Sequence, residues 1–306
     1  MKTLVAVDVS KETLQIQTES KGWVESNDSN GIATLIKGIG KMEEPFVVCE
    51  ATGGYERLLM QYMHDRAVPV CRVNPARVRA FARSEGIRAK TDPVDAKVIL
   101  KFAREKELAP TVPPTPEHQR LGELLDRRSH LTEMLAREKN RLQNSSKGIH
   151  SSIRRIIRAL ENEEIRIEGE IRKLTTNHPT IKKQVDVLTR IIGVGEITAW
   201  SVLGYLGEID RIGRNEVVAL AGIAPFNRDS GKMKGKRKII GGRAKVRKCL
   251  YMAAQTAALH NPVIKRYFEH LTAKGKPYKC AMVAVMRKLL IHMRSELIIL
   301  KKEVAL

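Results

Sequence analysis

The chain has 306 residues, a length that favours two domains, and it carries 55 Lys and Arg against 34 Asp and Glu. The resulting net charge of +21 attracts polyanions, so nucleic acid is the leading expected partner and an anionic membrane surface is the alternative. Every apolar run is far shorter than the roughly 20 residues that span a bilayer, and the start of the chain turns polar too soon for a signal peptide. The four cysteines form no CxxC pair, which argues against a zinc site or a disulfide framework and favours the cytoplasm.

The first 108 residues alternate short apolar runs with helical patterns, which is typical of an α/β domain. Strands are expected at residues 4–7, 13–18, 46–49 and 69–73, with a further strand beginning at 23–24, and helices at residues 31–42 and 55–66. This order predicts a largely parallel sheet with an antiparallel hairpin at its start.

Two acidic residues, Asp8 and Glu50, each follow an apolar strand. In open α/β sheets, functional groups collect at the carboxyl ends of strands. Two neighbouring carboxylates resist joint ionisation, and a divalent cation removes that repulsion. Carboxylate oxygens suit Mg²⁺ (or Mn²⁺), so this pair is a candidate metal site.

A second acidic pair, Asp92 and Asp95, lies in the segment KTDPVDAKVILKFA. Pro93 fits the first position of a helix, so Asp92 is expected in the cap position and Asp95 on the first turn, on the same side. A capping box worth about 1 kcal/mol is the alternative interpretation. All four acids together, in so basic a chain, favour a site that holds metal ions against a scissile phosphate. Basic residues that precede this pair are expected to bind phosphates: Arg77, Arg79, Arg83, Arg88 and Lys90.

Prolines at positions 110, 113, 114 and 116 mark a boundary, after which the pattern becomes helical. Leu and Ile stripes over 117–188 predict two long amphipathic helices, as a coiled coil or helical hairpin. Packing of these two helices against each other within one chain and a dimer interface between two chains are equally favoured alternatives. Residues 189–306 are expected to be mostly α-helical, with a Gly193-Val194-Gly195 turn that resembles a helix–hairpin–helix but is as often a plain connection.

A strongly basic loop runs from about residue 225 to residue 243 and leads into a helix. It contains Ser230 between Asp229 and Gly231, among cations that can hold a phosphate beside the hydroxyl, as a nucleophile needs. Composition alone favours an ordinary Asp-Ser-Gly turn in a solvated loop that touches phosphates without specificity. The basic residues expected to contact nucleic acid here are Arg228, Lys232, Lys234, Lys236, Arg237, Lys238, Arg243, Lys245 and Arg247.

Several motifs occur together in one order: VAVDVSKETL, VCEATGGYERLL, KTDPVDA, APFNRDSG and GGRAKVRKCL. With them the chain resembles the DEDD transposases of the IS110 insertion-sequence family, the bridge-RNA-guided recombinases. The resemblance spans nearly the whole chain, and the KTDPVDA and APFNRDSG segments are its most specific parts.

The resemblance implies an RNase H-like (Holliday-junction-resolvase-like) domain over residues 1–110, whose metal-binding tetrad would be Asp8, Glu50, Asp92 and Asp95. Residues 111–188 would form a coiled-coil oligomerisation segment that assembles homodimers into tetramers, and residues 189–306 a helical transposase domain. Ser230 would form a covalent phosphoserine link to DNA. A structured guide RNA would pair with donor and target DNA, so that base pairing chooses the sequence.

The expected function is therefore DNA strand cleavage and exchange. The protein is expected in the cytoplasm of a bacterium or archaeon, associated with the nucleoid. A metal-dependent Holliday-junction-type nuclease without serine chemistry is the alternative, and a non-enzymatic nucleic-acid-binding protein is a third hypothesis. If Ser230 and the tetrad act on one phosphate, we expect them to come from different subunits.

Overall fold

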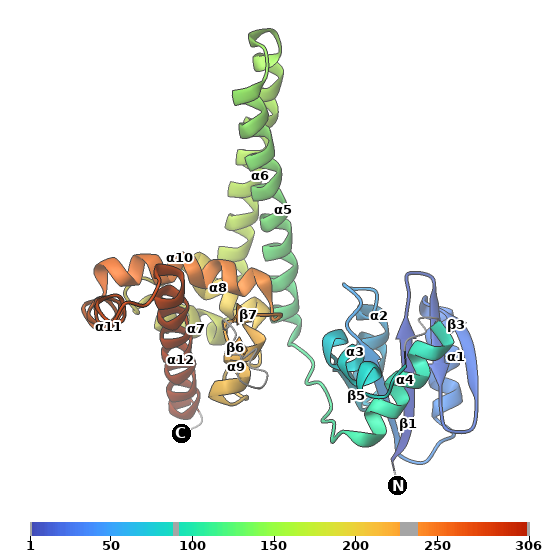
Figure 1. The fold of residues 1–306 in the computed structure, drawn as a ribbon. Coiled ribbons are helices and arrows are strands. Elements are labelled where there is room, and N and C mark those ends of the chain that lie inside the picture. The colour runs from blue at the N-terminus through green and yellow to red at the C-terminus, as the bar shows by residue number, and fades with distance from the viewer. Residues whose placement is uncertain (1, 88–91, 227–237, 305–306) are drawn as a thin grey trace. The chain divides into compact units, whose positions relative to one another are not determined.

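The computed structural model describes residues 2–87, 92–226 and 238–304 (Figure 1). The chain divides into two compact units, Met1–Pro113 and Pro114–Leu306. Among the described residues, no helix has both the length and the apolar character needed to cross a membrane.

The first unit is built on a five-stranded sheet with the order β3-β2-β1-β4-β5. Its strands are β1 (Thr3–Val9), β2 (Thr13–Gln17), β3 (Gly22–Ser26), β4 (Pro45–Glu50) and β5 (Val70–Val73). β1 pairs antiparallel with β2 and β2 with β3, whereas β1, β4 and β5 are parallel. The predicted parallel sheet with an antiparallel hairpin at its start is confirmed, and this mixed sheet is compatible with an RNase H-like α/β domain.

Helices cover both faces of this sheet, because successive residues of a strand point to opposite sides. On one face Val5, Val7 and Val47 share a core with α1 (Ser29–Ile39) and α2 (Arg57–Asp65). On the other face Ala6, Phe46 and Val48 share a core with α3 (Pro75–Ser84) and α4 (Asp92–Glu105).

Helix α3 was not among the predicted elements, since its residues were interpreted only as a basic stretch. Its start has an ordinary signal: Asn74 accepts a hydrogen bond from the backbone N–H of Ala76, and Pro75 stands in the first turn. Val78 and Phe81 then bury one face of the helix. Helix α4 begins at Asp92 itself, one residue earlier than the predicted cap arrangement.

The segment after α4 stays attached to the first unit along the edge strand β5. The backbone N–H of Thr111 donates to the carbonyl of Val70 (2.8 Å), and the Thr111 hydroxyl accepts from the backbone N–H of Arg72 (2.9 Å). His64 Nε2 lies 3.1 Å from the carbonyl oxygen of Thr111. These contacts cover part of an edge that would otherwise present unpaired backbone groups.

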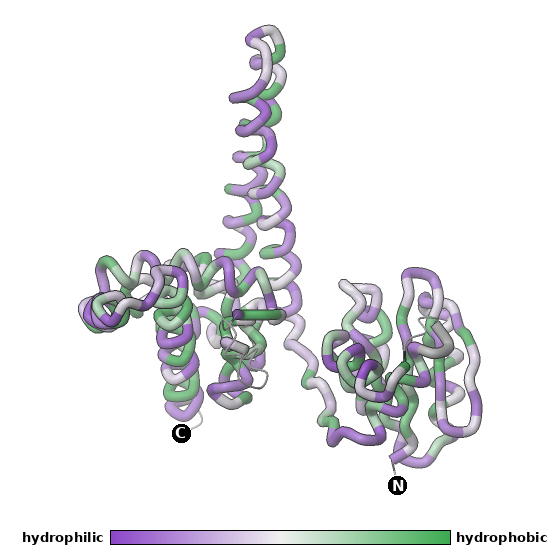
Figure 2. The backbone as a smooth tube through the Cα atoms, in the orientation of Figure 1, coloured by the Kyte–Doolittle hydropathy of each residue, from purple (hydrophilic) through white to green (hydrophobic). Residues whose placement is uncertain are grey.

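In the second unit, α5 (Pro116–Asn144) and α6 (His150–Asn177) form a long antiparallel hairpin through a short 3₁₀ turn, η1 (Lys147–Ile149). The hairpin projects beyond the other helices of its unit (Figure 1). Hydrophobic and hydrophilic residues alternate along both of its helices (Figure 2). The predicted helical hairpin is thus confirmed, whereas the coiled coil and the dimer interface between chains stay predictions.

The base of this hairpin shares one hydrophobic core with the remaining helices. These are α7 (Pro179–Thr189), α8 (Glu196–Tyr205), α9 (Arg214–Leu220), α10 (Ala244–His260), α11 (Pro262–Ala273) and α12 (Tyr278–Val304). Helix α11 was not predicted. The division proposed at residue 188 remains a prediction, and residues on both sides of it contribute to this core.

Two short strands, β6 (Pro225–Phe226) and β7 (Lys238–Ile239), pair antiparallel in the second unit. They bracket residues 227–237, here called the serine segment, which lies outside the described residues. Predicted site residues outside the described part of the chain are Arg88, Lys90, Arg228, Ser230, Lys232, Lys234, Lys236 and Arg237.

Candidate active-site residues

Asp8 and Glu50 lie at the same edge of the sheet. Val7 pairs with Cys49 in the parallel ladder of β1 and β4, so the next residue on each strand is an acid. The two-residue alternation puts Asp8 on the side of Ala6 and Glu50 on the side of Val48, the face that α3 and α4 cover. Asp8 and Glu50 therefore lie at neighbouring strand ends and on the same face of the sheet.

Asp95 belongs to the same neighbourhood. It lies four residues before Ile99 and seven before Phe102, both of which pack into the core under α4. Residues at this spacing share one face of a helix, so Asp95 is on the stripe that faces the sheet. The backbone of Asp92 begins the same helix, but its side chain lies outside the described part.

The electrostatics of Glu50 show how closely these acids interact. Burial raises the pKa of Glu50 first, and the charges of Asp8 and Asp95 raise it further, to about 7. Arg79 on α3 opposes the shift without cancelling it. The three carboxylates are each partly buried, and the charges of Asp8 and Asp95 reach Glu50.

This donor set fits a hard divalent cation, because its oxygens are the ligands that Mg²⁺ prefers. Within the described residues, no three His, Cys, Asp or Glu side chains are arranged to hold a metal ion by themselves. An ion bound by Asp8, Glu50 and Asp95 would therefore also draw on Asp92, on water or on substrate phosphates.

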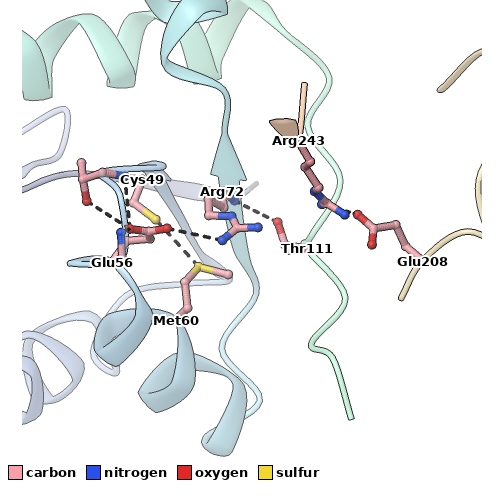
Figure 3. Close-up of polar contacts among 9 residues, drawn as sticks. Cys49, Glu56, Met60, Arg72, Thr111, Glu208 and Arg243 are labelled. Atoms are coloured by element: carbon pink, nitrogen blue, oxygen red, sulfur yellow. Dashed lines mark hydrogen bonds and ion pairs between the residues drawn. The ribbon is translucent and has the colours of Figure 1, made fainter. Parts of the chain in front are cut away.

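A buried acid that the sequence reasoning missed, Glu56, holds the loop that follows Glu50 (Figure 3). Its carboxylate accepts hydrogen bonds from the backbone N–H groups of Gly54 (2.9 Å) and Thr52 (3.1 Å) and from the Thr52 hydroxyl (3.2 Å). Arg72 Nη1 lies 3.3 Å away, and the Glu56 side chain is only 4% exposed. Burial acts to raise its pKa, but these hydrogen bonds and Arg72 outweigh burial and lower it.

Replacing Glu56 by Ala should lower the free energy of unfolding by about 3 kcal/mol, because Arg72 and two backbone donors would lose their buried partner. Urea denaturation followed by circular dichroism measures this change. Glu12→Ala, at an exposed position, is the control and should change stability by less than about 0.5 kcal/mol. Equal effects of the two substitutions would contradict the role assigned to Glu56.

Two glycines lie in contact where the residues before and after the serine segment meet. Gly222 and Gly242 have φ of 68° and 69°, in the left-handed region. A Cβ on Gly242 would lie 2.2 Å from the backbone nitrogen of Gly222, so the two backbones are in direct contact. The backbone N–H of Arg243 donates to the carbonyl of Leu220 (2.7 Å), and Arg247 Nη1 donates to the carbonyl of Gly241 (2.7 Å).

Gly242→Ala should destabilise the second unit by at least about 2 kcal/mol more than Gly241→Ala. Both glycines have a positive φ, but a Cβ on Gly241 would meet no atom within 4 Å. Gly241→Ala therefore reports the cost of the backbone conformation alone. The difference between the two urea midpoints measures the backbone contact, and its absence would show that Gly222 and Gly242 move apart freely.

The predicted nucleic-acid contacts fall into two groups. Lys245 pairs with Asp126, Arg243 with Glu208, and Arg247 binds backbone carbonyls, so these three already make contacts within the unit. Arg79 and Arg83 are exposed and line a surface cavity at the start of α3. Arg77 lies over the Phe102 ring at 5.5 Å, and Lys238 is exposed.

Comparison with known proteins gives two family matches. Residues 5–150 match a family model for DEDD transposases of the IS110 type, and residues 185–269 match a model described as the transposase IS116/IS110/IS902 family. The chain is also similar to the pilin gene-inverting proteins of Moraxella lacunata and Moraxella bovis. Each is 27% identical over 302 residues, which cover 94% of both chains.

The mixed α/β unit with its strand-end acids is thus that of an enzyme that rearranges DNA. The chain belongs to the IS110 family of transposases. Its substrate is accordingly DNA, and membership of a DEDD family usually implies the use of a divalent metal ion.

Proposed function

We propose that this transposase cleaves and exchanges DNA strands with two sets of groups, a carboxylate tetrad and a serine. Asp8, Glu50, Asp92 and Asp95 would hold Mg²⁺ or Mn²⁺, and Ser230 would be the nucleophile. The observation that carries the first half is the cluster of Asp8, Glu50 and Asp95, whose mutual repulsion contributes to the raised pKa of Glu50. A divalent ion would relieve that repulsion.

When bound, such an ion would stabilise negative charge on the scissile phosphate. The protein would supply the carboxylate oxygens of the tetrad in their ionised form. Glu50 holds a proton below about pH 7 and must release it before its carboxylate can act as a ligand. Arg79, on the same face, supplies a fixed positive charge that favours the ionised form.

The serine step needs no external energy source. Ser230 Oγ would attack phosphorus, forming a bond to the phosphate while the bond to one deoxyribose oxygen breaks and that oxygen takes up a proton. Attack by the hydroxyl of a new strand would reverse the step, free Ser230 and join the strands. The residues on either side of the serine segment are held together by the pairing of β6 with β7 and by the contact of Gly222 with Gly242.

Strand exchange rather than simple cutting is supported by the two relatives. They are named for the inversion of a pilin gene, and inversion requires that cut strands be rejoined. We also propose that a structured guide RNA pairs with donor and target DNA, and that homodimers assemble into tetramers in the nucleoid-associated cytoplasm. The net charge of +21 and the resemblance to bridge-RNA-guided recombinases support this part.

A junction nuclease that uses the carboxylates alone is the second candidate, because the carboxylate cluster does not itself require a serine. Incubation of Ser230→Ala with supercoiled DNA and Mg²⁺ separates the two. The serine mechanism predicts that nicking and exchange both disappear, whereas the nuclease predicts that nicking continues at the wild-type rate.

A further inference from the structure

The outer part of the α5–α6 hairpin carries an excess of positive charge. Residues 137–158, here called the basic tip, contain seven Lys and Arg and a single acid, Glu138. The basic residues are Arg137, Lys139, Arg141, Lys147, Arg154, Arg155 and Arg158. None of them was among the residues expected to contact nucleic acid.

The rest of α6 is different, because its charges neutralise one another. Residues 159–177 hold five Glu against three Lys and Arg. Arg128 of α5 pairs with Glu164 (3.3 Å) and Glu168 (2.8 Å), and Arg166 pairs with Glu163 (2.7 Å) and Glu170 (2.6 Å). These pairs stabilise the hairpin itself.

In the basic tip, by contrast, Arg154, Arg155 and Arg158 are all exposed, and none has an acidic partner within 4.0 Å among the described residues. Arginine side chains held this close together, without acids between them, repel one another unless a polyanion lies across them. The packing of the hairpin does not require them, since the neighbouring Ile153 and Ile157 fill the interface with α5.

The two helices bring their basic residues to the same level. Lys139 of α5 contacts Glu161 of α6 (3.0 Å), so in an antiparallel pair Arg141 lies about level with Arg158. Helical rise puts about 15 Å between Arg137 and the turn at Lys147. Over that length each strand of duplex DNA carries about four phosphate charges, so the basic tip is long enough to contact several phosphates in a row.

We propose that the basic tip is a second DNA-binding surface, which holds the phosphate backbone of duplex DNA without reading its sequence. Arg154, Arg155 and Arg158 contact phosphates, which arginine recognises through its planar fork of donors. Duplex DNA is the partner because the family acts on DNA and because the tip projects from its unit (Figure 1). The proposal does not depend on the roles proposed for the carboxylates and Ser230.

The test is the salt dependence of binding by the full-length protein to a labelled duplex of mixed sequence. The triple substitution R154Q/R155Q/R158Q should reduce the slope of log K against log salt by about 2–3, and affinity at 0.1 M salt by at least about tenfold. R154K/R155K/R158K keeps the charges and should keep most of the slope.

The matched control is R120Q/R166Q/R172Q, which removes three arginines with acidic partners from the same two helices. It lowers the net charge equally but should leave the slope within about one unit of wild type. Equal effects of the two triple variants, or a loss that appears only with duplex RNA of the same sequence, would overturn the proposal. So would unchanged DNA binding together with a smaller oligomer by sedimentation, since the half-exposed Ile149 and Ile156 would then serve contacts between copies.

Discussion

Glu50→Gln and Asp8→Asn should each slow DNA strand cleavage by about 1000-fold or more while the chain stays folded. Each substitution removes a negatively charged oxygen from a cluster whose charges act on one another. An ion held there would then stabilise the charge of the transition state by several kcal/mol less. Cleavage rates on a labelled substrate at saturating Mg²⁺ measure the loss. Glu43→Gln, an exposed acid away from this cluster, should cleave at the wild-type rate.

The raised pKa of Glu50 also gives this prediction a pH dependence. An acid whose folded pKa is raised from 4.5 to about 7 binds more protons when folded, so the free energy of unfolding falls as the pH rises through that window. Without metal, Glu50→Gln should therefore be more stable than wild type by about 1–2 kcal/mol above about pH 7, after allowance for partial exposure. Below about pH 4.5 the two should be equal.

Adding Mg²⁺ at about pH 8 should reverse the order, since it stabilises wild type and not Glu50→Gln. Urea denaturation at about pH 4.5 and about pH 8, each with and without Mg²⁺, tests all four conditions. A stability difference that is independent of pH and of Mg²⁺ would show that Glu50 is a structural acid and not a ligand.

Ser230→Ala should abolish both cleavage and strand exchange, because no other group would form the covalent bond to phosphorus; losses of about 1000-fold or more are usual when a nucleophile is removed. We further expect activity to return when Ser230→Ala chains are mixed with Asp92→Asn chains. If serine and tetrad come from different subunits, half of the dimers are mixed and one site in each is complete, which restores about one quarter of the sites. No recovery after co-refolding of the two variants would place both groups in the same subunit.

Much of the first unit could be predicted because its signals are local. Two-residue alternation and strand ends placed Asp8 and Glu50 at adjacent positions of the sheet, and helical spacing placed Asp95 on the first turns of α4. Helix α3 was not predicted because only Val78 and Phe81 mark its buried face, and the arginines between and around them give the segment the pattern of a basic stretch. The Asn-Pro pair at its start is the local signal that indicates the helix.

Other features depend on partners far away in the chain. Glu56 precedes α2 and could not be recognised as a buried anchor without Arg72, which lies on strand β5. Lys245 counts as a free cation in the sequence, yet its partner Asp126 stands 119 residues earlier. Charge composition reports how many cations a segment has, whereas only tertiary structure shows which of them already have partners.

We propose above all that Ser230 becomes covalently linked to DNA in a reaction that also needs the carboxylate cluster. Trapping the protein on DNA in the presence of Mg²⁺, followed by digestion and mass spectrometry of the adduct, tests it directly. We predict a nucleotide attached to the Ser230 peptide in wild type and no adduct in Ser230→Ala or in Asp8→Asn. Strand exchange without any adduct, or an adduct that persists in Ser230→Ala, would contradict the account.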